Sequence, residues 1–162
     1  MNYAIVHFLE ERLNKNHTLF EYGSGYSTLF YAARVAKVES IENSTYWYEH
    51  MASQVPANAS VSLVPADIDG AYCRSILRLD NSYDVIVIDG RDRANCLLQS
   101  LSKLSPSGVV ILDDSSRERY QTLIAKAVEQ GFRFLHFEGL KPTATGLHRS
   151  TIFYRSDNCF NI

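Results

Sequence analysis

Short apolar runs and helical patterns alternate along the chain. Runs of strand length cover residues 18–22, 37–42, 60–65, 83–89 and 108–113. The last two are nearly continuous in Val and Ile, which is typical of central parallel strands covered on both faces. This alternation predicts a doubly wound α/β sheet with right-handed crossovers and helices on both faces.

The helical patterns lie between these runs. Residues 120–128 place apolar side chains at helical spacing, and Gly131 follows where a helix end favours a positive φ. A similar stripe covers residues 94–104 and stops at the Ser-Pro-Ser-Gly segment 105–108. Further helices are expected over residues 1–13, 28–36 and 45–55, with a loop or a short helix over 67–79.

The end of the chain breaks the alternation. Phe132 to Glu138 and Ser150 to Arg155 are two strand-like runs without a helical pattern between them. The connection is too short for a helical crossover, so this pair is expected to be antiparallel. The sequence therefore predicts five parallel strands closed by an antiparallel pair.

Composition and charge describe an ordinary soluble protein. The chain has 162 residues and a hydrophobic fraction of 46%, which predicts a single domain over residues 1–162. The net charge of -2 gives no basic footprint, so we expect no nucleic-acid partner. Three scattered cysteines indicate reduced thiols rather than a zinc site, and no apolar run suits a membrane span or a signal peptide. We expect a cytoplasmic location without a membrane partner.

A glycine turn follows the first strand and opens a helix. The segment 20–28 reads FEYGSGYST, in which Gly23 and Gly25 allow a tight turn and the close approach of a ligand. Ser27 or Thr28 can cap the helix, whose N-terminus suits a carboxylate or a phosphate. Thr28 stands where the dinucleotide fingerprint has its third glycine, which disfavours a dinucleotide.

Two acidic residues flank this turn. Glu21 would repel a pyrophosphate and attract a cationic group such as an ammonium or a sulfonium. Glu42 ends the second strand, where a carboxylate can accept both hydroxyls of a ribose. Asp67, after the third strand, is either an adenine contact or an acid on a surface loop.

Together these motifs resemble the class I S-adenosylmethionine-dependent methyltransferases. The resemblance rests on E-Y-G-S-G-x-S-T at the first strand, the acid after the second and I-D-G at the fourth, and it covers residues 18–156. It implies a seven-stranded sheet of order 3-2-1-4-5-7-6 with the last strand antiparallel. It also implies a cofactor site made of Glu21, Tyr22, Gly23, Ser24, Gly25, Thr28, Glu42, Asn43, Asp67, Ile68 and Asp89.

Three more carboxylates lie at strand ends. Asp89 ends the fourth strand, and Asp113 and Asp114 end the fifth, so they are expected to face the crevice of the glycine turn. Converging carboxylates favour a hard cation such as Mg²⁺, and the pattern resembles metal-dependent catechol O-methyltransferases, although Asp114 stands where an Asn is common. Alternatively, Asp113 and Asp114 cap the next helix. Without an ion, Asp89 is the best candidate for a general base, ahead of Asp114.

Other residues near these motifs give weaker indications. Arg91 and Arg93 could hold an anionic acceptor, or they could be solvated residues at a helix start. His148, in the long connection 139–150, could assist proton transfer. Trp47 could face a sulfonium.

The expected reaction is transfer of a methyl group to a small molecule, at an oxygen in preference to a nitrogen. Two alternatives stay open: a nucleotide-binding α/β module without catalysis, and an NAD-dependent oxidoreductase. The short chain suits either an open site or a homodimer whose partner completes the pocket.

Overall fold

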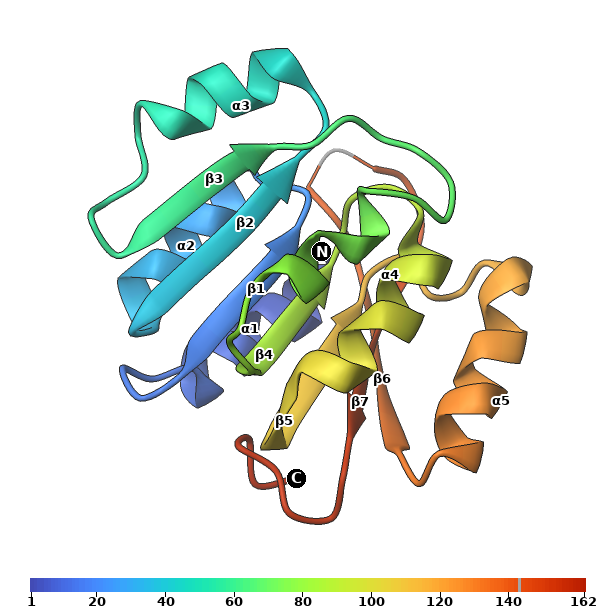
Figure 1. Cartoon of the computed structure of the whole chain (residues 1–162). Helices are drawn as coiled ribbons and strands as arrows, with labels where there is room; N and C mark the ends of the chain where they lie inside the picture. Colours follow the sequence, from blue (N-terminus) through green and yellow to red (C-terminus); the bar gives the residue numbers. More distant parts are fainter. Residues whose placement is uncertain (143) are drawn as a thin grey trace.

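A seven-stranded sheet forms the centre of the computed structural model, which describes residues 1–142 and 144–162 (Figure 1). Its order is β3-β2-β1-β4-β5-β7-β6. The strands are β1 (Thr18–Tyr22), β2 (Lys37–Glu42), β3 (Ala59–Leu63), β4 (Tyr83–Ile88), β5 (Leu104–Leu112), β6 (Arg133–Gly139) and β7 (His148–Tyr154). Strands β1 to β5 pair in parallel, and β7 is antiparallel to both β5 and β6. The predicted sheet is confirmed in its order and directions.

Helices cover both faces of this sheet. They are α1 (Tyr3–Arg12), α2 (Tyr26–Arg34), α3 (Thr45–Ala52), α4 (Arg93–Ser100) and α5 (Gln121–Glu129), with 3-10 turns η1 (Cys73–Arg78), η2 (Leu101–Lys103) and η3 (Glu118–Tyr120). Helices α1 and α2 lie on one face, and η1, α4 and α5 lie on the other (Figure 1). Within the described residues, no helix is both long enough and apolar enough to cross a membrane.

The continuous Val and Ile runs of β4 and β5 supply two separate cores. In β4, Val85 and Val87 pack toward α1 and α2, whereas Ile86 and Ile88 pack toward α4 and α5. These four side chains are fully buried, and each stabilises the fold by about 1.5–3 kcal/mol relative to an exposed position. Burial on both faces explains why these strands show no alternation of apolar and polar residues.

Several element boundaries differ from the prediction by a few residues, among them the start of β5. Strand β5 begins at Leu104 and not at Gly108, because Leu104 pairs with Tyr83 ahead of a register shift between Tyr83 and Val85. The ambiguous segment 67–79 contains the 3-10 turn η1, which packs against α4. None of these differences changes the order of the strands.

The buried side chain of Asn2 connects helix α1 to the β6–β7 hairpin. Asn2 caps the helix by accepting a hydrogen bond from the Ile5 amide at 3.1 Å. Its amide nitrogen also donates to the backbone oxygens of Phe137 and His148, at 2.9 and 3.0 Å. The N-terminal end of α1 therefore lies near the carboxyl ends of the central strands.

Candidate active site

The carboxyl ends of β1, β2 and β4 surround a cleft of about 520 Å³. Its lining includes the turn residues 23–27 together with Glu42, Asn43, Trp47 and Asp89. Parallel strands place their carboxyl ends at one edge of the sheet, which is where open α/β sheets bind ligands. Of the predicted cofactor residues, the structure brings Gly23, Ser24, Gly25, Glu42, Asn43 and Asp89 together here.

Gly23 has to be a glycine because the backbone of the turn after β4 passes directly against it. Its φ is +93°, and a Cβ on Gly23 would lie 2.7 Å from the Cα of Gly90. A Cβ on Gly90 would in turn overlap the hydroxyl of Tyr72. The turns after β1 and β4 can therefore approach this closely only while both positions lack a side chain.

Gly25 has no such structural reason to be a glycine. Its φ of 172° is extended backbone, and apart from its two chain neighbours no described residue has an atom within 4 Å of where its Cβ would be. Gly25 lines the cleft, and it precedes α2 directly. The missing side chain leaves room for a ligand beside the N-terminus of α2, where free N–H groups and the helix dipole favour a carboxylate.

Glu42 is held in place by the turn that follows β2. Its Oε1 accepts hydrogen bonds from the amides of Asn43 and Ser44, at 2.8 and 2.7 Å. Its Oε2 accepts a hydrogen bond of 3.3 Å from the hydroxyl of Ser24. One oxygen thus fixes the carboxylate, and the other faces the glycine turn inside the cleft.

Glu21 lies beneath the turn, and the cleft lining does not include it. The side chain is fully buried and accepts hydrogen bonds from Ser27 at 2.5 Å, Thr28 at 2.6 Å and Ser40 at 2.8 Å. Burial raises the pKa of Glu21 to about 7, although these hydrogen bonds oppose the shift. Glu21 therefore supports the start of α2 from below.

Two other predicted cofactor residues also lie below the surface of the cleft. Thr28 is fully buried, and its hydroxyl accepts from the Gly25 amide at 3.1 Å while donating to Glu21. Tyr22 is fully buried and donates its hydroxyl to the backbone oxygen of Cys73 at 2.8 Å. Neither side chain lines the cleft, so both lie behind the residues that do.

Asp67 and Ile68 line a second cavity of about 520 Å³. Asp67 accepts hydrogen bonds from the amides of Tyr72 and Ala71, at 3.0 and 2.7 Å, which hold its pKa below the usual value. Ile68 is 89% exposed, so its side chain is free to contact a ligand. The second cavity shares the wall around Arg91 with the cleft, and the two cavities are therefore adjacent.

Asp89 lies at the edge of the cleft beside Asp113, Arg93 and the Met1 amine, which is 3.6 Å from its Oδ2. Burial, together with the nearby Asp113, raises the pKa of Asp89 to about 6. Arg93 opposes this rise, because its Nη2 lies 2.9 Å from Oδ1 of Asp89. A carboxylate with this pKa is largely ionised at neutral pH and still basic enough to accept a proton.

Asp113 is fully buried behind Asp89 and surrounded by donors. Lys141 places its Nζ 2.5 Å from Oδ2, the Ser150 hydroxyl lies 2.6 Å from Oδ1, and the Met1 amine lies 3.6 Å away. Burial alone would raise the pKa of Asp113, but the Met1 amine and Lys141 bring it well below the usual value. Asp113 is thus a structural carboxylate in its ionised form.

Asp114 is closer to the surface and has its own partners. His148 Nδ1 and Lys141 Nζ lie 3.1 and 3.2 Å from its Oδ1, and Arg117 Nη2 lies 3.0 Å from its Oδ2. Burial and Asp113 raise its pKa, but the hydrogen bonds from His148 and Lys141 outweigh them and lower it. A carboxylate with these partners is a weaker base than Asp89.

The metal site predicted at Asp89, Asp113 and Asp114 is not supported. Across residues 1–142 and 144–162, no three acidic, histidine or cysteine side chains are arranged to hold an ion. The reason is local charge, because Lys141 and Arg93 supply the positive charge that the sequence interpretation gave to Mg²⁺.

Sequence reasoning missed the roles of Lys141, Arg93 and Tyr72. Lys141 lies in the β6–β7 connection and contacts Asp113 and Asp114. A local sequence pattern does not predict a contact over this distance along the chain. Arg93 is the first residue of α4 and reaches Asp89 across the turn after β4, which the sequence does not indicate. Tyr72 lies within the segment that the sequence left ambiguous, and its hydroxyl supports the turn after β4.

Comparison with known proteins finds similarity to solved structures but no match in sequence. No protein-family model matches the chain, and no curated protein matches it. Among solved structures, the precorrin-6y C5,15-methyltransferase of Geobacter metallireducens superposes with a TM-score of 0.72 at 11% identity, over 94% of this chain and 87% of the other.

Two further solved structures are similar over nearly the whole chain. The N-methyltransferase NodS of Bradyrhizobium japonicum, in complex with S-adenosyl-L-homocysteine, has a TM-score of 0.65 at 12% identity, over 94% of this chain and 83% of NodS. An rRNA methylase of Streptococcus thermophilus has a TM-score of 0.66 at 12% identity, over 93% and 94% of the two chains. The chain therefore has the fold of the class I, Rossmann-like S-adenosylmethionine-dependent methyltransferases.

Proposed function

We propose that this chain is an S-adenosylmethionine-dependent methyltransferase that methylates an oxygen of a small molecule. The observation that carries the proposal is the pairing of Gly25 and Glu42 across one cleft. Gly25 leaves an open space that the fold itself does not need, and Glu42 presents a fixed carboxylate oxygen to the same space. A nucleoside with a carboxylate at its other end matches both features.

The residues of the two cavities would bind different parts of the cofactor. Glu42 and Asn43 would take the ribose hydroxyls, and the bare backbone at Gly25 would take the methionine carboxylate. Asp67 and Ile68 would take the adenine in the adjacent cavity. When bound, S-adenosylmethionine supplies a methyl group on a positively charged sulfur, which is the reactive part of the chemistry.

Asp89 would act as the general base. Its carboxylate accepts the proton of the acceptor hydroxyl, and it later releases that proton to water. Its raised pKa suits this task near neutral pH, whereas Asp114 is held by His148 and Lys141 and has a lowered pKa. Arg93 would serve as a positioning residue that keeps the Asp89 carboxylate at the edge of the cleft.

Calorimetric titration of the full chain tests the cofactor assignment. S-adenosylmethionine and S-adenosylhomocysteine should bind with micromolar affinity, and NAD⁺ should not bind. Tight binding of NAD⁺ with no binding of the two sulfur nucleosides would overturn the proposal. A screen of phenols, sugars and hydroxy acids with methyl-labelled cofactor then tests the acceptor class, for which labelled ethers or esters are the expected products.

A further inference from the structure

The second cavity carries more positive charge than a nucleoside needs. Its lining includes Arg91, Arg93, Arg117 and Arg119, against the two acids Asp67 and Asp92, and we refer to it as the arginine pocket. Residues 66–68, after β3, form one wall, and Arg117, Arg119 and Tyr120, after β5, form another. Residues 90–94, after β4, lie between them. The pocket therefore has a net positive charge at the edge of the cofactor cleft.

The two acids of the arginine pocket are already occupied by neutral partners. Asp67 accepts from two backbone amides of its own loop. Asp92 accepts from the Asp69 amide at 2.8 Å and from the side-chain amide of Asn95 at 3.0 Å. Neither carboxylate forms an ion pair with an arginine of the pocket within the part of the chain that the structure describes.

Two of the four arginines have structural roles. Arg93 is nearly buried and holds the backbone oxygens of Asp89 and Asp113, at 3.0 and 2.6 Å. Arg117 lies 3.0 Å from the Asp114 carboxylate. These two guanidinium groups are therefore partly satisfied by the protein.

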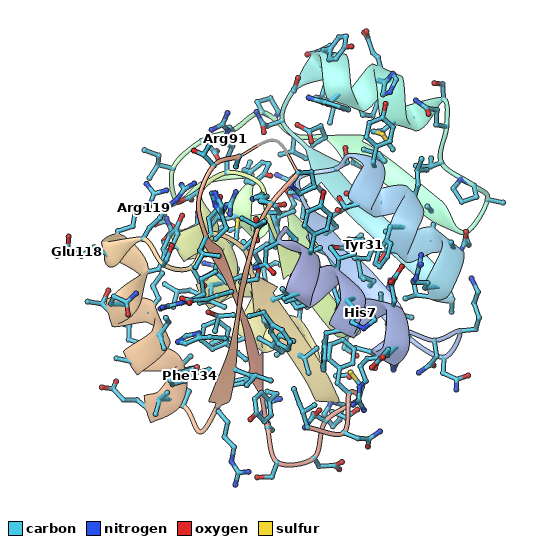
Figure 2. The ribbon with its side chains drawn as sticks, turned by 180° about the vertical axis from the view of Figure 1, so that it is seen from behind. His7, Tyr31, Arg91, Glu118, Arg119 and Phe134 are labelled. Carbon is cyan, nitrogen blue, oxygen red and sulfur yellow. The ribbon has the colours of Figure 1, made fainter. Side chains whose placement is uncertain are left out.

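Arg91 and Arg119 are different, because neither has a carboxylate partner within residues 1–142 and 144–162. Arg119 donates a hydrogen bond to the hydroxyl of its neighbour Tyr120, with Nη2 at 2.9 Å, and its guanidinium lies over the Tyr120 ring. Arg119 lies near the start of α5, Arg91 lies nearer the loops above the sheet, and Glu118 points outward (Figure 2). Both arginines line the same pocket. Their donors are available to a ligand.

The proposed cofactor leaves these donors unused. Adenine is neutral and would contact Asp67 and Ile68, while the methionine carboxylate would lie at Gly25 in the other cavity. We therefore infer that Arg91 and Arg119 bind an anionic group of the methyl acceptor, and that a phosphate ester is the group that matches two guanidinium groups lining one pocket. This inference rests on the proposed function and adds the substrate class, a phosphorylated small molecule. Guanidinium groups bind phosphate oxygens through paired, charge-assisted hydrogen bonds.

A small molecule fits this pocket better than RNA does. The positive charge is gathered inside one cavity of about 520 Å³, a volume typical of small-molecule sites. The chain as a whole has a net charge of -2 and lacks the general basic character of RNA-binding domains. Arg91 also lines the cofactor cleft, so a phosphate held by Arg91 places the rest of its molecule next to Asp89.

Titration with inorganic phosphate at constant ionic strength tests this inference, since the whole acceptor is unidentified. The full chain, saturated with S-adenosylhomocysteine, should bind phosphate at least tenfold more tightly than acetate. The double variant Arg91→Gln/Arg119→Gln should lose at least tenfold in phosphate affinity. The control Arg133→Gln removes an exposed arginine at the start of β6 and should leave phosphate affinity within twofold of the wild type.

The outcomes separate this inference from the proposed function. Equal phosphate affinity in the double variant and the wild type, equal binding of acetate and phosphate, or much tighter binding of a short single-stranded RNA would each overturn the phosphorylated acceptor. The urea unfolding midpoint of the double variant should match that of the wild type, which shows that it is folded. If the wild type binds phosphate but no S-adenosylhomocysteine, the anion site stands and the cofactor assignment fails.

Discussion

Arg93 links Asp89 to the end of the neighbouring strand. Its Nη2 lies 2.9 Å from Oδ1 of Asp89, and its Nη1 donates to the backbone oxygen of Asp113 at 2.6 Å. The same guanidinium donates to the backbone oxygen of Gly90 at 3.0 Å. One side chain thus links the ends of β4 and β5, positions the proposed base and opposes the rise in its pKa.

Removal of that base should lower the rate of methyl transfer. Asp89→Asn cannot accept a proton, so the expected loss in kcat is about 100-fold or more. In the wild type the rate should rise with pH through about 6 and then level off, because only the ionised Asp89 acts as a base. The measurement is a pH–rate profile with a phosphorylated hydroxyl acceptor found by screening.

A matched variant shows whether the effect is specific to Asp89. Asp80→Asn changes an exposed acid in the loop before β4 and should keep the wild-type rate and profile. If Asp89→Asn keeps both as well, Asp89 is not the base.

Gly23 and Gly25 should respond differently to the same substitution. Gly23→Ala forces a side chain against Gly90 at a positive φ, so it should lower the free energy of unfolding by about 2–4 kcal/mol. Gly25→Ala meets no protein atom, so it should unfold like the wild type but lose at least tenfold in S-adenosylhomocysteine affinity. Urea unfolding and calorimetry on both variants check this pair. Full cofactor affinity in Gly25→Ala would show that the open space there is not a ligand site.

Glu21 should make the fold less stable as the pH rises. Its pKa is raised from 4.5 to about 7 by burial, so the fold favours the neutral carboxyl. The stabilisation is complete below pH 4.5 and is lost as the pH rises through about 7, because the unfolded chain ionises first. Glu21→Gln stays neutral and should lose less stability than the wild type between pH 5 and pH 8.

Urea midpoints at the two pH values measure this difference. Glu129→Gln removes an exposed carboxylate from α5 and serves as the control, which should follow the wild type. A Glu21→Gln variant with the same pH dependence as the wild type would show that Glu21 is already ionised in the fold.

Lys141 should stabilise the fold through Asp113. Lys141→Met removes the closest cation from a buried carboxylate, which is expected to cost about 3 kcal/mol of unfolding free energy at pH 7. The lowered pKa of Asp113 gives stability that is complete above its ordinary value of 3.8 and is lost as the pH falls below it, so the deficit of the variant should shrink below about pH 4. Adding Asp113→Asn should recover part of the loss at pH 7. A deficit that does not change with pH would assign the effect to packing.

The sequence was sufficient for the sheet and for part of the site. The Val and Ile runs of β4 and β5 predicted buried parallel strands, and Glu42 and Asp89, at the ends of β2 and β4, line the cleft. The burial of Glu21 is harder to predict. Neighbouring residues of a strand point to opposite faces, so Glu21 lies opposite Phe20, on the face that α2 covers. Whether a helix closes over a side chain depends on tertiary packing, which local patterns do not contain.

The metal prediction failed for a related reason. A sequence shows which acids end neighbouring strands, but the cation that compensates them comes from a distant loop. Lys141 lies 2.5 Å from Asp113 although 28 residues separate the two along the chain. Without that contact, an ion was the simplest way to balance three converging carboxylates.

The most direct test of the cofactor site is the affinity of S-adenosylhomocysteine for two glutamate variants. Glu42→Ala removes the carboxylate that faces the cleft, and Glu49→Ala removes an exposed carboxylate from α3, the helix that follows β2. Calorimetry should show about a 10- to 100-fold loss for Glu42→Ala, as expected for hydrogen bonds to a charged group, and no change for Glu49→Ala. Wild-type affinity in the Glu42→Ala variant would contradict the cofactor site described here.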